Sequence, residues 1–164
     1  MLYGMKGILT DGGNKFMLEI KFYEEADDSL LKLAVIIARS EGKWVFCKHK
    51  ERDTYEFPSG HREEGEDILA TAKRELYEET GALEYSLKPV CIYSVNGFDG
   101  IVRNDEETYG MLYFGDISRF GEMPDFEMEK IELSERLPEH WTYQEVQPRL
   151  MEKAISVLFQ NGKI

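Results

Sequence analysis

Alternating apolar and polar residues predict a β-strand at residues 14–23 that is buried on one face. Its apolar side carries Phe16, Leu18, Ile20 and Phe22. A mostly apolar run at 30–38, rich in branched residues, is typical of a strand buried on both faces. The run 43–49 follows the turn residues Glu41-Gly42, so we expect it to form a hairpin with the preceding strand.

The spacing of apolar residues changes to three and four at 66–80, which predicts an α-helix. This spacing is set by Ile68, Leu69, Ala72 and Leu76. Glu66 and Asp67 are placed in the first turn, where the positive end of the helix dipole favours carboxylates. Gly81 suits the left-handed conformation that ends many helices, so we expect the helix to end there.

The remainder of the chain predicts more strands and a final helix. Strands are expected at 86–95, 108–117 and 131–133. The turn-rich pairs Asn96-Gly97 and Asp99-Gly100 separate the first two, and 122–129 is expected to be an exposed acidic loop. Apolar residues four apart over 144–160 predict an amphipathic helix, whose main part begins near Pro148 because proline is tolerated at the first helical position. This order indicates one α+β or mixed α/β domain over residues 1–164.

The composition favours an ordinary globular domain and excludes some partners. The chain has 164 residues, of which 42% are hydrophobic and 32% charged. Its 20 basic and 32 acidic residues give a net charge of -12, which argues against nonspecific coating of DNA. A phosphorylated small molecule stays possible, because a metal ion can invert the field of a carboxylate cluster.

The cellular location is expected to be the cytoplasm. No apolar run approaches the roughly 20 residues that cross a bilayer, and residues 1–13 lack the apolar region of a signal peptide. Cys47 and Cys91 lie in strand-like apolar runs, where we expect free thiols in a reducing compartment; a disulfide is the alternative. The oligomeric state is not predicted.

Three glutamates of the predicted helix carry the candidate chemistry. Glu75, Glu78 and Glu79 are related by three and four residues, so they project from one face of the helix. Carboxylates at this spacing repel one another. Two interpretations remain: a solvated acidic face, which could contact a protein partner, or a site for Mg²⁺ or Mn²⁺, whose charge removes the repulsion.

The segment 60–82 resembles the signature of the Nudix hydrolase family. That signature reads Gly, five residues, Glu, seven residues, Arg-Glu, an aliphatic residue, any residue, Glu-Glu, any residue, Gly and an aliphatic residue. Its positions are held here by Gly60, Glu66, Arg74, Glu75, Leu76, Glu78, Glu79 and Gly81, and Ala82 stands at the last one. Upstream, residues 55–60 (Tyr-Glu-Phe-Pro-Ser-Gly) are similar to the segment that precedes the signature in this family, with Ser59 where glycine is usual.

The resemblance implies a role for each matching residue. Glu75, Glu78 and Glu79 correspond to the metal-binding glutamates, and the carbonyl of Gly60 corresponds to a further ligand. Arg74 corresponds to the arginine that braces a glutamate, which suits a bidentate guanidinium. Glu66 is expected to have a structural role. The fold implied is the Nudix fold, a mixed β-sheet sandwiched between helices.

The implied activity is metal-dependent hydrolysis of a nucleoside diphosphate linked to another moiety. We expect a nucleoside triphosphate, cleaved to the monophosphate and pyrophosphate. The run from Lys43 to Pro58 also resembles small bacterial 8-oxo-dGTP diphosphatases, so an oxidised nucleotide is included. ADP-ribose, dinucleoside polyphosphates and the 5′ end of RNA stay open, as does a nucleotide sensor that has lost catalysis.

The general base is expected outside the signature, in the acidic loop. Glu127 and Glu129 are the candidates, and we favour Glu127; a glutamate of the helix could serve instead. His49 and His61 flank the site in sequence, and surface histidines are the simpler interpretation. The basic residues of this region are Lys48, Lys50, Arg52 and Arg62. They either attract a polyanion or offset nearby acidic residues.

Aromatic residues near the signature are expected to belong mainly to strands or the core. They are Tyr55, Phe57, Tyr93 and Tyr113. Phe57 is the best candidate for stacking on a base, because it adjoins the signature. No serine lies in a recognisable hydrolase motif, so the sequence does not support a serine hydrolase.

Overall fold

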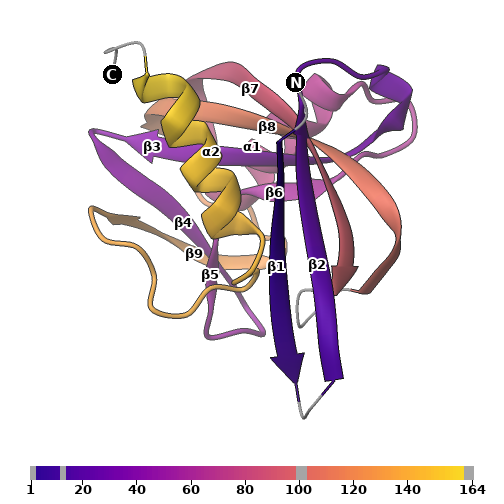
Figure 1. The fold of residues 1–164 in the computed structure, drawn as a ribbon. Helices are drawn as coiled ribbons and strands as arrows, with labels where there is room; N and C mark the ends of the chain where they lie inside the picture. Colours follow the sequence, from indigo (N-terminus) through magenta and orange to yellow (C-terminus); the bar gives the residue numbers. More distant parts are fainter. Residues whose placement is uncertain (1–2, 12–13, 99–102, 161–164) are drawn as a thin grey trace.

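One mixed β-sheet joins the strands of the described residues, 3–11, 14–98 and 103–160 of a computed structural model (Figure 1). The strands are β1 (Tyr3–Asp11), β2 (Asn14–Tyr23), β3 (Leu31–Ser40), β4 (Lys43–His49), β5 (Tyr55–Glu56), β6 (Ser59–His61), β7 (Ala82–Phe98), β8 (Arg103–Phe120) and β9 (Met128–Ser134). Their order is β1-β2-β7-β8-β3-β4-β5, with β6 paired to β3 and β9 paired to β4. The β3–β8 pair is parallel and the others are antiparallel, which makes the sheet mixed as expected.

The sheet opens between β3 and β4. These strands pair only where they form their hairpin, at Arg39–Trp44 and Ser40–Lys43. Beyond that point β6 takes the edge of β3 and β5 takes the edge of β4. The segment 55–61 therefore fills the opening, and it lies beside the helix that carries the glutamates.

Two helices cover opposite faces of the sheet (Figure 1). Helix α1 (Ile68–Thr80) buries Ile68, Ala72 and Leu76 against one face. Helix α2 (Gln147–Phe159) buries Leu150, Met151 and Ala154 against the other. Because full burial of a large apolar side chain stabilises a fold by roughly 1.5–3 kcal/mol, these two contacts fix both helices to the sheet. The predicted sandwich is confirmed.

Most predicted elements are confirmed. The strands expected at 14–23, 30–38 and 43–49 are β2, β3 and β4. Gly81 has a left-handed φ of 72° and ends α1 as expected. Helix α2 begins at Gln147 with Pro148 in its first turn. Cys47 and Cys91 are both free thiols.

Other boundaries need correction. Helix α1 begins at Ile68, so Asp67 is its N-cap and accepts a hydrogen bond from the Ala70 amide, while Glu66 precedes the helix. The strands expected at 86–95, 108–117 and 131–133 all extend further, and Asn96-Gly97 lies within β7 rather than in a turn. Asp99-Gly100 lies outside the described residues. The short 3-10 helix η1 (Asp28–Leu30) follows the acidic turn after β2.

Three strands, β1, β5 and β6, have no counterpart in the prediction.

None of the helices in the described part of the chain is long and apolar enough to cross a membrane.

Candidate active site

Helix α1 turns its glutamates towards the loop that fills the sheet opening. Gly60 lies directly against Glu75: a Cβ at residue 60 would overlap the Glu75 carboxylate. The absence of a side chain at Gly60 therefore creates the space that this carboxylate occupies. The chain brings together the two residues that the signature places fifteen positions apart.

Glu79 is the most deeply buried glutamate of the helix, with 8% of its surface exposed. The Ser59 amide donates a hydrogen bond of 2.9 Å to Glu79 Oε2. Burial raises the pKa of Glu79 well above its ordinary value, and the charges of Glu75, Glu56 and Glu127 raise it further. A cation placed here would lower the cost of ionising Glu79.

Arg74 lies among the acidic residues of the signature and bonds several of them. Its guanidinium donates to Glu66 Oε1 at 2.6 Å, Glu75 Oε1 at 2.7 Å, Glu78 Oε2 at 3.2 Å and the His61 carbonyl at 2.9 Å. Arg74 therefore holds Glu75 and Glu78 while it fixes the end of β6. This is the geometry that the bracing role requires.

Glu66 is a structural partner of that arginine. Besides Arg74, it accepts hydrogen bonds from the Thr71 hydroxyl at 2.8 Å and the Glu63 amide at 3.1 Å. These bonds, led by that of Arg74, lower the pKa of Glu66 to about 2. Its oxygens are occupied, so Glu66 is poorly placed to bind a cation.

We expect Glu66 to make stability depend on acid pH. Because its pKa is lower in the folded protein, its contribution is fully present above the unfolded pKa of about 4.5 and is lost as pH falls towards about 2. Glu66→Gln should therefore destabilise the protein at pH 6 and much less at pH 2.5, as measured by urea unfolding. Glu64→Gln, at an exposed neighbouring position, is the control. An equal loss at both pH values would contradict the assignment.

Glu56 is a buried carboxyl that the sequence analysis did not assign to the site. It lies on β5 opposite Cys47, and only 3% of its surface is exposed. Burial raises the pKa of Glu56 to about 7, against the lowering effects of a hydrogen bond with Thr142 and of Arg52. In the sequence, Glu56 stands immediately before the apolar Phe57-Pro58 pair, which could have suggested that it is buried. A two-residue strand is too short to show an alternation, so the sequence does not reveal which face of the sheet the Glu56 side chain is on.

Glu127 lies within the electrostatic field of these carboxyls. Its charge raises the pKa values of Glu56, Glu75 and Glu79. The loop before β9 is held there because the Lys50 amide donates a 3.0 Å hydrogen bond to the Glu127 carbonyl. The exposed Glu127 side chain is thus brought near the helix glutamates, more than 45 residues away in sequence.

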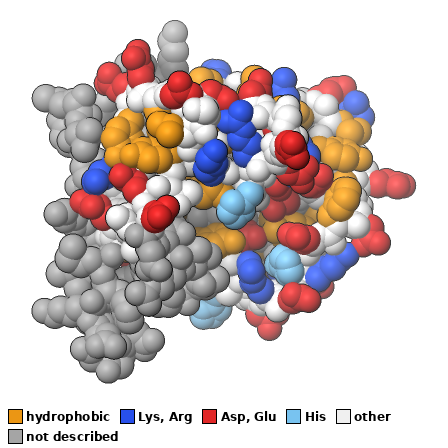
Figure 2. Space-filling model, turned by 90° about the vertical axis from the view of Figure 1, so that its right-hand side faces the viewer, with side chains coloured by type: hydrophobic (Ala, Val, Ile, Leu, Met, Phe, Trp, Pro, Cys, Tyr) orange, Lys and Arg blue, Asp and Glu red, His pale blue; other side chains and the backbone are white. Residues whose placement is uncertain are grey.

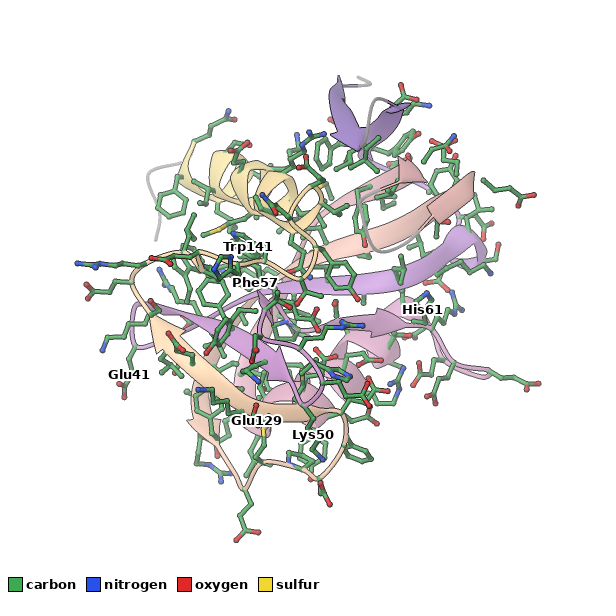
Figure 3. All side chains as sticks on the ribbon, turned by 90° about the horizontal axis from the view of Figure 1, so that it is seen from below. Glu41, Lys50, Phe57, His61, Glu129 and Trp141 are labelled. Atoms are coloured by element: carbon green, nitrogen blue, oxygen red, sulfur yellow. The ribbon has the colours of Figure 1, made fainter. Side chains whose placement is uncertain are left out.

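The other candidate, Glu129, lies on β9 rather than in the loop and is paired with a basic residue. Its carboxylate pairs with Lys48, which also lies 3.7 Å from Asp53. Figure 3 shows Glu129 and Lys50 near one another at one end of the β4–β9 pair, away from His61. These positions favour Glu127 over Glu129 as the candidate general base.

The basic residues of the region are paired with carboxylates. Lys48 pairs with Glu129, Lys50 with Asp125, Arg52 with Glu56 and Arg62 with Asp28. Figure 2 shows acidic and basic side chains interspersed over one face of the molecule, without a continuous basic patch. Of the two interpretations from sequence, the structure supports the offsetting of acidic residues.

Phe57 is not available for stacking on a base. It is completely buried and packs against Trp44, Phe46 and Trp141 (Figure 3), at ring-centroid distances of 6.3, 4.8 and 5.8 Å respectively. The expectation that Phe57 belongs to the core is confirmed, and its candidacy for stacking on a base is excluded. Its position next to the signature reflects packing under α2, because β5 directs alternate residues to opposite faces.

The residues present fit a divalent cation, although their side chains are not gathered around one point. Within the described residues, no three His, Cys, Asp or Glu side chains are grouped closely enough to hold a metal ion. The donor set is nevertheless suitable: hard carboxylate oxygens, a glycine that makes room for Glu75, and a buried Glu56 Oε2 with no hydrogen bond in the part of the chain described. A cation would compete with Arg74 for Glu78.

Comparison with known proteins agrees with this geometry. The family model for the NUDIX domain matches residues 30–159. The chain belongs to the Nudix family. The match covers β3 to the end of α2 and so includes every site residue described above. The protein is a Nudix pyrophosphohydrolase, a class of enzyme that acts on nucleoside diphosphates linked to another group. Such enzymes generally depend on a divalent cation.

Individual relatives extend the match. The Bacillus subtilis protein named "Putative 8-oxo-dGTP diphosphatase YtkD" is 33% identical over 124 residues, covering 75% of this chain and 74% of that protein. A crystal structure of a mutant B. subtilis pyrophosphohydrolase, BsRppH, superposes with a TM-score of 0.69 at 27% identity, covering 90% and 94% of the two chains. An RNA pyrophosphohydrolase from Psychrobacter is 35% identical over 57 residues, which are 35% of this chain and 33% of that protein.

Proposed function

We propose that this Nudix hydrolase cleaves a nucleoside triphosphate, including oxidised forms such as 8-oxo-dGTP, to the monophosphate and pyrophosphate. The observation that carries the proposal is the meeting of Glu75 and Glu79 with the loop 59–60 in the opening of the sheet. The relative named for 8-oxo-dGTP, matched over three quarters of the chain, supports this substrate class.

The proposed cation is Mg²⁺ or Mn²⁺, held by Glu75, Glu78, Glu79 and the Gly60 carbonyl. When bound, it would neutralise the charge of the pyrophosphate and stabilise the leaving oxygen. Arg74 positions Glu75 and Glu78 through its hydrogen bonds to both. The Ser59 amide does the same for Glu79. The protein thus orients three carboxylates that would otherwise repel one another.

Glu127 is the proposed general base. It is exposed, so a water molecule can reach it, and its charge raises the pKa values of Glu56, Glu75 and Glu79. In the proposed step one O–H bond of the water breaks and its proton passes to Glu127. The water oxygen bonds to phosphorus, and the phosphorus–oxygen bond to the leaving group breaks with its electron pair.

Glu127→Gln is expected to lower kcat by about 100-fold or more, because the amide cannot take up a proton. The Mg²⁺ concentration at half-maximal activity should change little, since Glu127 is not among the proposed ligands. A Mg²⁺ titration of initial rates measures both quantities. A large rise in the Mg²⁺ requirement would make Glu127 a ligand instead.

Hydrolysis at the 5′ end of RNA is the second candidate function, because an RNA pyrophosphohydrolase matches part of the chain. The two are separated by kcat/KM for dGTP, 8-oxo-dGTP and a 5′-triphosphorylated oligoribonucleotide, with products resolved by chromatography. A higher kcat/KM for the free nucleotides would support the proposal. A higher kcat/KM for the RNA would contradict it and favour hydrolysis at the 5′ end of RNA. Nucleotide binding without turnover of any of them would indicate a sensor.

The cytoplasmic location remains a prediction. The two free cysteines support it, because reduced thiols persist in that compartment.

A further inference from the structure

Glu56 occupies an unusual position for a charged residue. Its neighbours on the chain, Tyr55 and Phe57, direct their side chains towards the α2 face, whereas Glu56 points to the α1 face. Glu56 belongs to the segment 55–61, which fills the sheet opening beside α1, and its charge raises the pKa values of both Glu79 and Cys47. A glutamate that is 3% exposed is rare in proteins unless its carboxylate has partners.

The two oxygens of Glu56 differ in their surroundings. The Thr142 hydroxyl lowers the pKa of the carboxyl by favouring its charged form. Among the residues that the structure describes, none forms a hydrogen bond with Oε2; the nearest charge is Arg52 Nη1, at 3.9 Å. An acceptor buried without a hydrogen bond is unfavourable, so its retention calls for an explanation.

Several other acidic side chains of the region bind basic residues. Glu66 and Glu78 are bonded to Arg74, and Glu129 is paired with Lys48. Glu56 Oε2 is therefore a buried acceptor that pairs with Arg52 only at 3.9 Å and receives no hydrogen bond from the described residues, whereas Glu127 lies on the exposed loop before β9. The charge of Glu127 contributes to the raised pKa of Glu56, although the two residues come from different elements.

We propose that Glu56 is a catalytic residue whose Oε2 accepts a hydrogen bond from the attacking water. This inference rests on the proposed function and extends it. Water has two O–H bonds: Glu127 takes the proton of one, and Glu56 holds the other. The second O–H bond stays intact and passes to the product phosphate. Two acceptors fix the direction of the water lone pair, which orients it towards phosphorus.

The surroundings of Glu56 hold it rigidly enough for this role. The Phe57 amide donates a 2.7 Å hydrogen bond to Gln147 Oε1 at the start of α2. The Thr142 amide donates to the Tyr55 carbonyl at 2.9 Å. The backbone on both sides of Glu56 is thus fixed to the segment 142–147, and the burial of the side chain limits the positions open to the carboxyl.

Glu56→Met tests the proposal because methionine has a similar length and no acceptor oxygen. The fold should survive, since Thr142 keeps its 2.7 Å hydrogen bond to Thr54. We expect kcat to fall by about 100-fold, with KM, the Mg²⁺ requirement and the melting temperature essentially unchanged. The control is Glu132→Met, at an exposed position opposite Phe46 on the other face of β4.

The double variant Glu56→Met/Glu127→Gln separates a shared water from independent roles. If both residues act on one water, the double variant should lose little more activity than the more damaging single variant. Multiplied losses would overturn the proposal, as would a kcat of Glu56→Met close to that of the wild type. A loss accompanied by a lower melting temperature would also overturn it, because that would indicate a structural role.

A second Glu56 variant and the activity of the wild type separate the remaining explanations. If Glu56→Met does not fold, Glu56→Leu is judged by the same criteria, because leucine also lacks an acceptor oxygen. Active wild-type protein with unaffected Glu56 variants would overturn this inference alone. Wild-type protein that turns over no nucleotide would overturn the proposed function and this inference with it.

Discussion

Glu79→Gln is expected to lower kcat by about 1000-fold or more while the folded protein becomes no less stable. The loss of activity follows because an amide is a poor ligand for a hard cation. Stability is preserved because glutamine can still accept the hydrogen bond from the Ser59 amide. It also removes a carboxyl whose ionisation burial opposes.

Because the pKa of Glu79 is raised in the folded protein, ionisation of this group weakens the fold as pH rises above the unfolded pKa of about 4.5. The melting temperature of Glu79→Gln, measured at pH 8 without divalent cations, should therefore equal or exceed that of the wild type. A clearly lower melting temperature, or turnover near the wild-type rate, would contradict the assignment.

Gly60→Ala is expected to raise the Mg²⁺ concentration at half-maximal activity by about 10- to 100-fold. The added Cβ would overlap the Glu75 carboxylate, which must leave its position. The displaced atoms are the end of a flexible side chain, so the fold should be retained. Kinetic titration with Mg²⁺ and thermal unfolding measure the two effects.

Gly65→Ala is the matched control for that substitution. Gly65 has φ of 84° and open space around its Cβ position. Alanine there should cost about 1 kcal/mol of stability through backbone strain and leave the Mg²⁺ requirement unchanged. Two glycines five residues apart should thus give opposite patterns. Equal Mg²⁺ requirements for Gly60→Ala and the wild type would remove Gly60 and Glu75 from the proposed cation site.

The parts of the fold that sequence patterns predicted are those with enough residues to show a period. The alternation in β2 and the helical spacing in α1 extend over ten and thirteen residues. Strands β5 and β6 have two and three residues, too few for any period. They exist because the separation of β3 from β4 leaves two strand edges to be paired, which is a property of the whole sheet.

The candidate site was predictable to the extent that it is local. Glu75, Glu78 and Glu79 share one helix, so their spacing alone placed them on a common face. Glu56 was missed because its direction depends on pairing with β4, and the burial of Phe57 depends on helix α2, about 90 residues later. The acidic partners of the basic residues likewise come from distant segments, such as Asp125 for Lys50.

The most direct test of this account is the hydrolysis of 8-oxo-dGTP and dGTP by the wild type and Glu79→Gln, with Mg²⁺ and then with EDTA. We predict equimolar nucleoside monophosphate and pyrophosphate from the wild type with Mg²⁺, neither product with EDTA, and release slowed by about 1000-fold or more in Glu79→Gln. Hydrolysis that persists in EDTA, or that Glu79→Gln retains near the wild-type rate, would contradict the claim that the glutamates of α1 form the cation site of a pyrophosphohydrolase.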